Sequence, residues 1–311
     1  MSALLDVIMP VFLVIGGGWL AARAKLFSDA AVDGLMRFAQ TFAVPVLLFL
    51  SISRLDLSAA YDIGLFISFY AGAFAAFGLG ILGARLLGRP GTDAVAIGFA
   101  CLFSNSLLLG LPITERAYGA DALAANYAII SIHSPLLYAT GITVMELTRS
   151  HGQGLPAGRL ARQVLRAIFS QPMVLGICAG FFVNLTGLPL PDFAWSALKM
   201  IGGAAIPTAL FGLGGVLYRY RPEGDGRAIA LVVGLSLLLH PAITWLLGSK
   251  VFGLSVEQLR SAVVTSSMAP GVNAYLFAHL YGVAKRVNAS AVLLATAASI
   301  GTIWMWLHIL P

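Results

Sequence analysis

Long apolar stretches separated by short polar connections limit most strongly how this chain can fold. Crossing the hydrocarbon core of a bilayer as a helix takes roughly 20 apolar residues, and the stretches here run to roughly 18–26 residues. Only 10% of the residues are charged, against about 25% in a soluble domain. The sequence therefore predicts an all-α membrane protein, embedded in a lipid bilayer, with ten spans: residues 3–22, 30–53, 62–88, 92–117, 121–148, 163–187, 193–218, 228–252, 256–281 and 286–310.

The distribution of basic residues predicts the orientation of the spans, because Lys and Arg collect in cytoplasmic connections. The odd-numbered connections and their flanks hold 13 of the 19 Lys and Arg residues, namely Arg23, Lys25, Arg85, Arg89, Arg149, Arg159, Arg162, Arg166, Arg219, Arg221, Arg227, Lys285 and Arg286. We therefore expect a multi-pass protein of the bacterial inner membrane with both termini in the periplasm. The net charge of +6 reflects this topology and does not indicate nucleic-acid binding.

An internal repeat recurs at an offset of 162 residues, for example between Pro45 and Pro207 (207 − 45). Further pairs at this offset are Ala43 and Ala205, Leu48 and Leu210, Phe49 and Phe211, Pro10 and Pro172, Gly18 and Gly180, and Ser104 and Ser266. We interpret residues 1–150 and 151–311 as two five-helix repeats. Since five is odd, the second repeat enters the membrane from the opposite side, and transporters built in this way bind substrate where the repeats meet.

The fourth and ninth spans contain helix-breaking and polar residues at corresponding places. Proline removes a backbone donor and clashes with the preceding turn, and in lipid such breaks persist only where protein or a cavity surrounds them. We therefore predict a substrate site at the two breaks, formed by Ser104, Asn105, Ser106, Gly110, Pro112, Ser266, Ser267, Pro270, Gly271 and Asn273. Two proline kinks that only improve packing are the alternative.

The chemistry of such a break suits an anion. We expect half-helices to start near Pro112 and near Pro270, because proline favours the first helical position. Helix starts present unpaired N–H groups and a partial positive charge. Carbonyl groups on the other side of each break can instead serve sodium or a proton carrier, and the sequence does not choose between these.

A few other residues are candidates for coupling or gating. Glu115 and His133 lie within spans, where ionisable side chains are functional candidates by default; an interfacial pair of Glu115 with Arg116 and a structural hydrogen bond of His133 are the alternatives. The matched prolines Pro45 and Pro207 are candidates for gating. Arg54 and Lys199 either attract anions at the outer vestibule or anchor the protein at the interface. The sequence contains no metal-ligand cluster, nucleophile motif or phosphate loop, so we predict neither a metal nor a cofactor.

Two motifs contain the predicted breaks: NSLLLGLPI with the following AYG (residues 105–119), and MAPGVNAYLFAHLYG (residues 268–282). They resemble the fourth and ninth helices of the auxin efflux carrier family, which includes plant PIN proteins and bacterial malonate- or malate-type permeases. FAVPVLLF resembles the second helix, and QPMVLGICAGFFVNLTGLPLP with GGAAIPTALFGLGGVL the sixth and seventh. The resemblance covers essentially the whole chain. The long central loop of plant PIN proteins is missing, so the bacterial branch is the closer match.

The resemblance implies a bile-acid-symporter-like fold in which broken helices four and nine cross. Helices 1, 2, 6 and 7 would form a scaffold, and helices 3–5 and 8–10 a transport core that moves like an elevator. It also implies a small mono- or dicarboxylate held near Asn105, and a homodimer. The expected function is secondary transport of such organic anions, with H⁺ or Na⁺ as possible coupling ion. A sodium-coupled bile-acid-type symporter is the alternative, and an enzyme is not expected.

Overall fold

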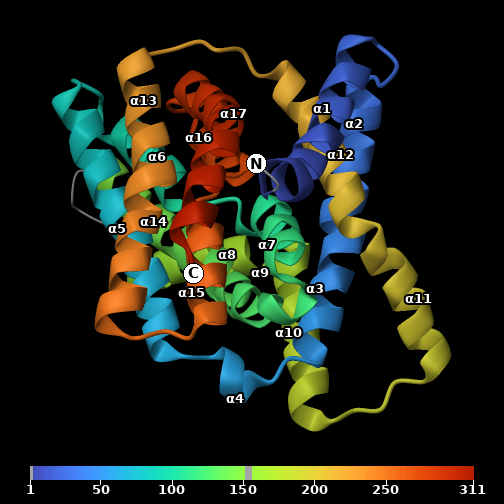
Figure 1. Ribbon diagram of the computed structural model, residues 1–311. Coiled ribbons are helices and arrows are strands. Elements are labelled where there is room, and N and C mark those ends of the chain that lie inside the picture. Colours follow the sequence, from blue (N-terminus) through green and yellow to red (C-terminus); the bar gives the residue numbers. More distant parts are fainter. Residues whose placement is uncertain (1–2, 151–155) are drawn as a thin grey trace.

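The computed structural model describes residues 3–150 and 156–311, and every regular element in these ranges is helical (Figure 1). Within these ranges, seven stretches are long and apolar enough to cross a bilayer. They are Leu5–Arg23, Asp29–Ser53, Ile63–Leu86, Ala120–Arg149, Asp192–Arg219, Gly226–Val251 and Lys285–Ile309. These stretches confirm the predicted helices of spans 1, 2, 3, 5, 7, 8 and 10 to within a few residues.

The principal helices in these stretches are α1 (Met9–Arg23), α2 (Asp29–Phe38), α3 (Val44–Ser53), α5 (Ile63–Leu86), α8 (Leu123–Arg149), α11 (Asp192–Gly203), α12 (Ala205–Arg219), α13 (Gly226–Gly234), α14 (His240–Leu246) and α17 (Lys285–Ile309). π-Helical turns link some of them: η1 (Ala3–Ile8) leads into α1, η2 (Ala39–Ala43) joins α2 to α3, and η5 (Leu235–Leu239) joins α13 to α14. The short helix α4 (Leu57–Ala60) connects α3 to α5.

The predicted sixth span, residues 163–187, is divided in the structure. Helix α9 (Ala157–Phe169) and helix α10 (Pro172–Thr186) meet at an angle of 80°. Pro172 cannot donate a backbone hydrogen bond, and the residue before a proline is driven out of the helical region; Gln171 accordingly has extended backbone angles. Helix α9 has no buried residue, so it lies on the surface of the helix bundle and α10 alone forms the sixth apolar helix.

The expected fourth and ninth spans are each interrupted. The fourth consists of α6 (Gly91–Leu102), the π-helical turn η3 (Ser106–Gly110) and α7 (Leu111–Tyr118). The ninth consists of α15 (Val256–Ser266) and α16 (Val272–Tyr281). At about 1.5 Å of rise per residue, none of these helices crosses a bilayer alone. The interruptions fall where the Ser, Asn, Pro and Gly residues predicted them.

Two close helix crossings hold α1 against α12 and α3 against α10, on the right of Figure 1. A Cβ atom at Gly18 of α1 would lie 1.9 Å from the carbonyl oxygen of Phe211 in α12. A Cβ atom at Gly180 of α10 would lie 3.0 Å from the carbonyl oxygen of Phe49 in α3. The absence of side chains thus lets the backbones approach closely, as small residues do between membrane helices. Both glycines and both phenylalanines are pairs at the 162-residue offset.

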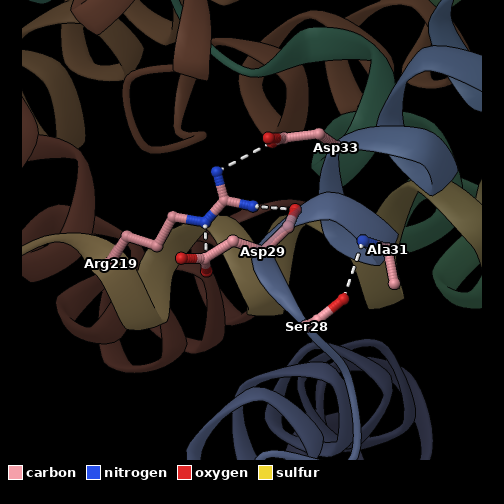
Figure 2. A network of polar contacts seen from close by, with 5 residues as sticks. All are labelled: Ser28, Asp29, Ala31, Asp33 and Arg219. Carbon is pink, nitrogen blue, oxygen red and sulfur yellow. Dashed lines mark hydrogen bonds and ion pairs between the residues drawn. The ribbon is translucent and has the colours of Figure 1, made fainter.

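A polar network ties the start of α2 to the end of α12 (Figure 2). The Arg219 guanidinium contacts the Asp29 carboxylate at 3.1 Å and the Asp33 carboxylate at 2.7 Å. The same guanidinium donates to the Asp29 carbonyl oxygen at 2.8 Å. Ser28 caps α2 by accepting the Ala31 N–H at 3.3 Å. Carboxylates at a helix start and arginine at a helix end both favour the helix dipoles.

The N-terminal turn η1 and the C-terminal residue Pro311 lie in one connected patch. Arg116 of α7 donates to the Asp6 carbonyl oxygen of η1 at 2.6 Å. Arg260 of α15 donates to the Pro311 carbonyl oxygen at 2.7 Å and stacks on Tyr118 of α7 at 4.5 Å. This patch joins the N-terminal turn, both broken segments and the C-terminus.

Candidate functional site

The two helix breaks lie side by side and hydrogen-bond to each other. Residues between α6 and η3 are not helical, and neither are residues between α15 and α16, so both segments expose backbone groups. The Asn105 N–H donates to the Ala269 carbonyl at 2.8 Å, and the Gly271 N–H donates to the Phe103 carbonyl at 3.1 Å. Ser104 and Pro270 form an isolated antiparallel bridge at the centre. Backbone groups freed by the breaks therefore find partners inside the protein, as a membrane interior requires.

The first break is followed by a helix start that Asn105 caps. The Asn105 Oδ1 atom accepts the Leu108 N–H at 3.3 Å, which is the usual role of asparagine at this position. Helix α7 begins at Leu111 with Pro112 in its first turn, as predicted, but it continues directly from η3, so helical structure at this break already begins at Ser106. The π-helical turn η3 lies just before Pro112; such turns often form where proline disrupts the regular ladder.

The second break ends at Gly271, and α16 begins at Val272. Pro270 precedes this start by two residues, so the prediction of a helix beginning near Pro270 is confirmed in position, although Pro270 itself lies outside the helix. Gly271 packs closely on the first break, since a Cβ atom there would lie 3.7 Å from Asn105 Cα. The starts of η3 and α16 therefore lie close to each other, beside the contact between the two breaks.

A cavity of about 570 Å³ opens beside the two breaks. Six of the predicted residues line it: Ser104, Asn105, Ser106, His133, Gly271 and Asn273. Val44 of α3 and Met173 of α10 line it from the opposite side. The cavity therefore lies between the helices that pack around α3 and α10 and the helices that carry the breaks.

His133 connects α8 to the first break. Its Nε2 atom lies 3.2 Å from the Ser104 carbonyl oxygen and 3.5 Å from Ser106 Oγ. The imidazole is buried among aromatic rings, with Phe103 at 4.9 Å and Phe69 at 5.7 Å between ring centroids. Its Nδ1 atom is buried and has no hydrogen-bond partner among the described residues.

The other predicted residues do not line the cavity. Ser266 and Ser267 are fully buried, and each hydroxyl donates to a carbonyl of its own helix, Val263 and Val264 respectively. The remaining residues outside the cavity lining are Gly110, Pro112, Pro270, Glu115, Pro45 and Pro207. The side chain of Glu115 is exposed, and Arg116 contacts Asp6 instead of pairing with it. Arg54 stacks on Trp195 at 4.3 Å, which fits the anchoring alternative.

Several polar residues of the cavity were not predicted as site residues: Gln40, Gln163, Arg166, Gln171 and Tyr281. In the sequence, Arg166 served only as an indicator of topology. The amphipathic pattern of α9 does not reveal that this helix packs beside the breaks. One local signal could have identified Arg166 as a candidate. It lies near the end of a basic amphipathic stretch that precedes Pro172, and a proline there predicts a change of helix direction.

Two buried asparagines brace the crossing, and they too are 162 residues apart. The Asn126 Nδ2 group donates to Thr114 Oγ1 at 3.2 Å and to Thr265 Oγ1 at 2.6 Å, joining α7 to α15. The Asn288 Nδ2 group donates to the Ala96 carbonyl at 2.9 Å and to the Ala274 carbonyl at 3.1 Å. These bonds join α6 to α16. Each asparagine therefore links one half of the first broken segment to the opposite half of the second.

The described residues contain no group of three or more His, Cys, Asp or Glu side chains that could hold a metal ion. The arrangement of cavity, helix starts and hydroxyl groups instead suits noncovalent binding of a small polar molecule.

Comparison with known proteins gives a consistent result. Residues 3–307 match the family described as membrane transport protein. A "Putative malonate transporter" of Rhizobium meliloti is 24% identical, covering 100% of this chain and 97% of the relative. An "Uncharacterized transporter" of Methanothermobacter thermautotrophicus is 27% identical, covering 85% of this chain and 86% of the relative. The "Uncharacterized transporter YfdV" of Escherichia coli K12 is 21% identical, covering 97% and 96%.

The family match covers nearly the whole length of the chain. The alignments with the Rhizobium and Escherichia coli relatives also cover nearly all of it. Together with the apolar helices, the family match identifies a multi-pass membrane transporter and not an enzyme. The chain belongs to the membrane transport protein family, which is the auxin efflux carrier family.

Proposed function

We propose that this protein is a secondary transporter of small carboxylates across the inner membrane, and that the anion binds where the two helix breaks cross. The observation that carries the proposal is the shared cavity beside two neighbouring helix starts. Arg166 is its charged lining residue, and no carboxylate is among the described residues that line it. A site with this charge balance favours an anion over a cation.

The energetics of binding support a carboxylate. A carboxylate loses several kcal/mol of hydration when it leaves water. Helix starts return up to about 2 kcal/mol each, and hydrogen bonds to a charged acceptor add about 1.5–3 kcal/mol each. Ser106, Asn273 and the first N–H groups of α16 supply such donors beside the cavity. In η3, the Ser106 N–H donates to the Ser104 carbonyl and the Leu108 N–H to Asn105 Oδ1. Several of the donors beside the cavity together offset the lost hydration.

The Rhizobium relative is named after malonate, which is a small dicarboxylate and therefore fits the proposed substrate class. Both carboxyl groups of malonate are ionised at neutral pH. A cytoplasm held negative by 100 mV favours anion exit by roughly 2.3 kcal/mol per charge. Efflux can therefore proceed without a coupling ion, whereas uptake needs a cation.

The proposed mechanism is an elevator-like movement of the broken helices past a scaffold of α1, α2, α3, α10, α11 and α12. The contact between these groups is largely apolar, with Val44, Leu48 and Ala209 on one side and Leu108 and Ile130 on the other. Apolar surfaces slide without breaking hydrogen bonds. The matched glycine contacts and the matched asparagines support two inverted repeats, residues 1–150 and 151–311.

Counterflow in proteoliposomes tests the proposal. Vesicles loaded with malonate, malate or indole acetate should accumulate the labelled acid by exchange. Ser106→Ala should weaken exchange about 10- to 150-fold, because one hydrogen bond to a charged acceptor is worth about 1.5–3 kcal/mol. Ser267→Ala is the matched control, because its hydroxyl bonds its own helix.

Absence of saturable exchange with any of these acids would count against a carboxylate carrier. Equal losses in both serine variants would remove the crossing as the binding site. Exchange that continues without sodium would eliminate the sodium-coupled alternative.

A further inference from the structure

We propose that the carrier takes up a proton together with its anion, and that the proton binds the imidazole of His133. The inference rests on the proposed function, because it names the coupling ion of the same site. Three features of His133 support it. Its Nε2 atom hydrogen-bonds the first break, its Nδ1 atom has no hydrogen-bond partner among the described residues, and its ring lines the cavity.

The hydrogen bond determines which nitrogen carries the proton in the resting state. A carbonyl oxygen can only accept, so the contact of Nε2 with the Ser104 carbonyl requires a hydrogen on Nε2. A neutral imidazole has a single N–H group, so Nδ1 then carries a free lone pair. Nδ1 is therefore the atom that a proton can occupy without breaking the bond to the helix break.

The surroundings of the ring keep it neutral until an anion arrives. From α5, Phe69 and Tyr70 face it, and the Tyr70 hydroxyl is engaged with the Ile129 carbonyl at 2.9 Å. From α14, His240 lies beyond Phe69. Phe103 and the Ser104 carbonyl face the ring from the break. The titratable groups that share the cavity wall with it are Tyr138, Arg166 and Tyr281.

No carboxylate is found among the described residues that line this cavity. A buried imidazolium without a counter-ion is unfavourable. A carboxylate bound at the crossing supplies that counter-ion, so the anion strengthens proton binding. By linkage, the proton strengthens anion binding by the same factor. One anionic charge and one proton therefore enter together, which links transport to the pH gradient.

His240 provides an internal comparison. Its Nε2 atom also lies 3.1 Å from a carbonyl oxygen, that of Phe69, and its Nδ1 atom is also buried without a partner among the described residues. It is fully buried but does not line the cavity. The two histidines thus have the same hydrogen-bonding arrangement, but of the two it is His133 that lines the cavity and can contact the substrate.

The experiment measures net malonate uptake into vesicles that contain no malonate, between pH 5.5 and 8.5, with a pH-sensitive dye inside the vesicles. Wild-type vesicles should acidify as malonate enters, and the apparent affinity should fall about tenfold per pH unit once the ring loses its proton. His133→Gln keeps a donor for the Ser104 carbonyl but cannot take a proton. This variant should take up malonate more slowly than wild type, with no pH dependence and no proton movement. His240→Gln should keep the wild-type pH profile.

The outcomes are distinguishable. Three outcomes each overturn proton binding at His133 while leaving carboxylate transport intact. They are net malonate uptake by wild type without proton movement, pH dependence that persists in His133→Gln, and loss of pH dependence in His240→Gln. No exchange in wild type refutes the proposed function itself. Should His133→Gln be inactive at every pH, ¹⁵N NMR of the wild-type histidines decides. The His133 Nδ1 signal must become protonated on addition of malonate, and an unchanged signal overturns the proposal.

Discussion

Adding one methyl group to Gly18 tests the close crossing of α1 and α12. A Cβ atom at this position would lie 1.9 Å from the Phe211 carbonyl oxygen, whereas ordinary contacts begin at 3.4 Å. The backbones must therefore separate by roughly the difference, 3.4 − 1.9 = 1.5 Å. Overpacking of this kind costs about 1–3 kcal/mol. We expect Gly18→Ala to lower the free energy of unfolding by this amount.

Gly16 is the matched control on the same helix. A Cβ atom there meets nothing within 4 Å, and replacing glycine by alanine in a helix stabilises it by up to about 1 kcal/mol. The two variants should therefore differ by about 2–4 kcal/mol. Gly180→Ala should be milder than Gly18→Ala, because its nearest atoms lie at 2.9 and 3.0 Å.

Thermal unfolding of the purified variants in one detergent, followed by a thiol-reactive dye or by circular dichroism, measures these differences. The expected order of midpoints is Gly16→Ala highest, then Gly180→Ala, then Gly18→Ala. Equal midpoints for the Gly16 and Gly18 variants would refute the close crossing of the two helices.

Three further predictions concern other parts of the molecule. Asn288→Leu removes two interhelical hydrogen bonds and should destabilise the protein by about 1–3 kcal/mol in the same unfolding assay; an unchanged midpoint contradicts the brace. Arg166→Gln should raise the KM for the anion about two- to fivefold in flux assays at low salt, whereas Arg162→Gln, outside the cavity lining, should not. The backbone N–H of Arg227, followed by the Arg89 guanidinium, lowers the pKa of the Asp225 carboxyl. The stabilisation that the ionised Asp225 contributes is therefore present above about pH 4 and is lost as the pH falls through the lowered pKa. In thermal unfolding, Asp225→Asn should be less stable than wild type at pH 7 and equal to it near pH 2.

Residues of the candidate site were partly predictable. Asn105, Gly271 and Asn273 interrupt apolar stretches, and a polar break inside a membrane segment has a local signature that needs no tertiary information. Ser266 and Ser267 carry the same signature, yet their hydroxyls turn back to their own helix. Side-chain direction depends on the helix phase at which the break begins, and composition does not determine that phase.

The sequence by itself determined the membrane class, most span boundaries and the positions of the breaks. Each of these follows from local length, hydrophobicity and backbone chemistry. Only the tertiary structure decided that Arg166 meets the cavity beside the two breaks. It also brought Asn126 and Asn288 to opposite halves of the crossing. These outcomes depend on contacts between segments more than 100 residues apart, and no local pattern in the chain records which segments will meet.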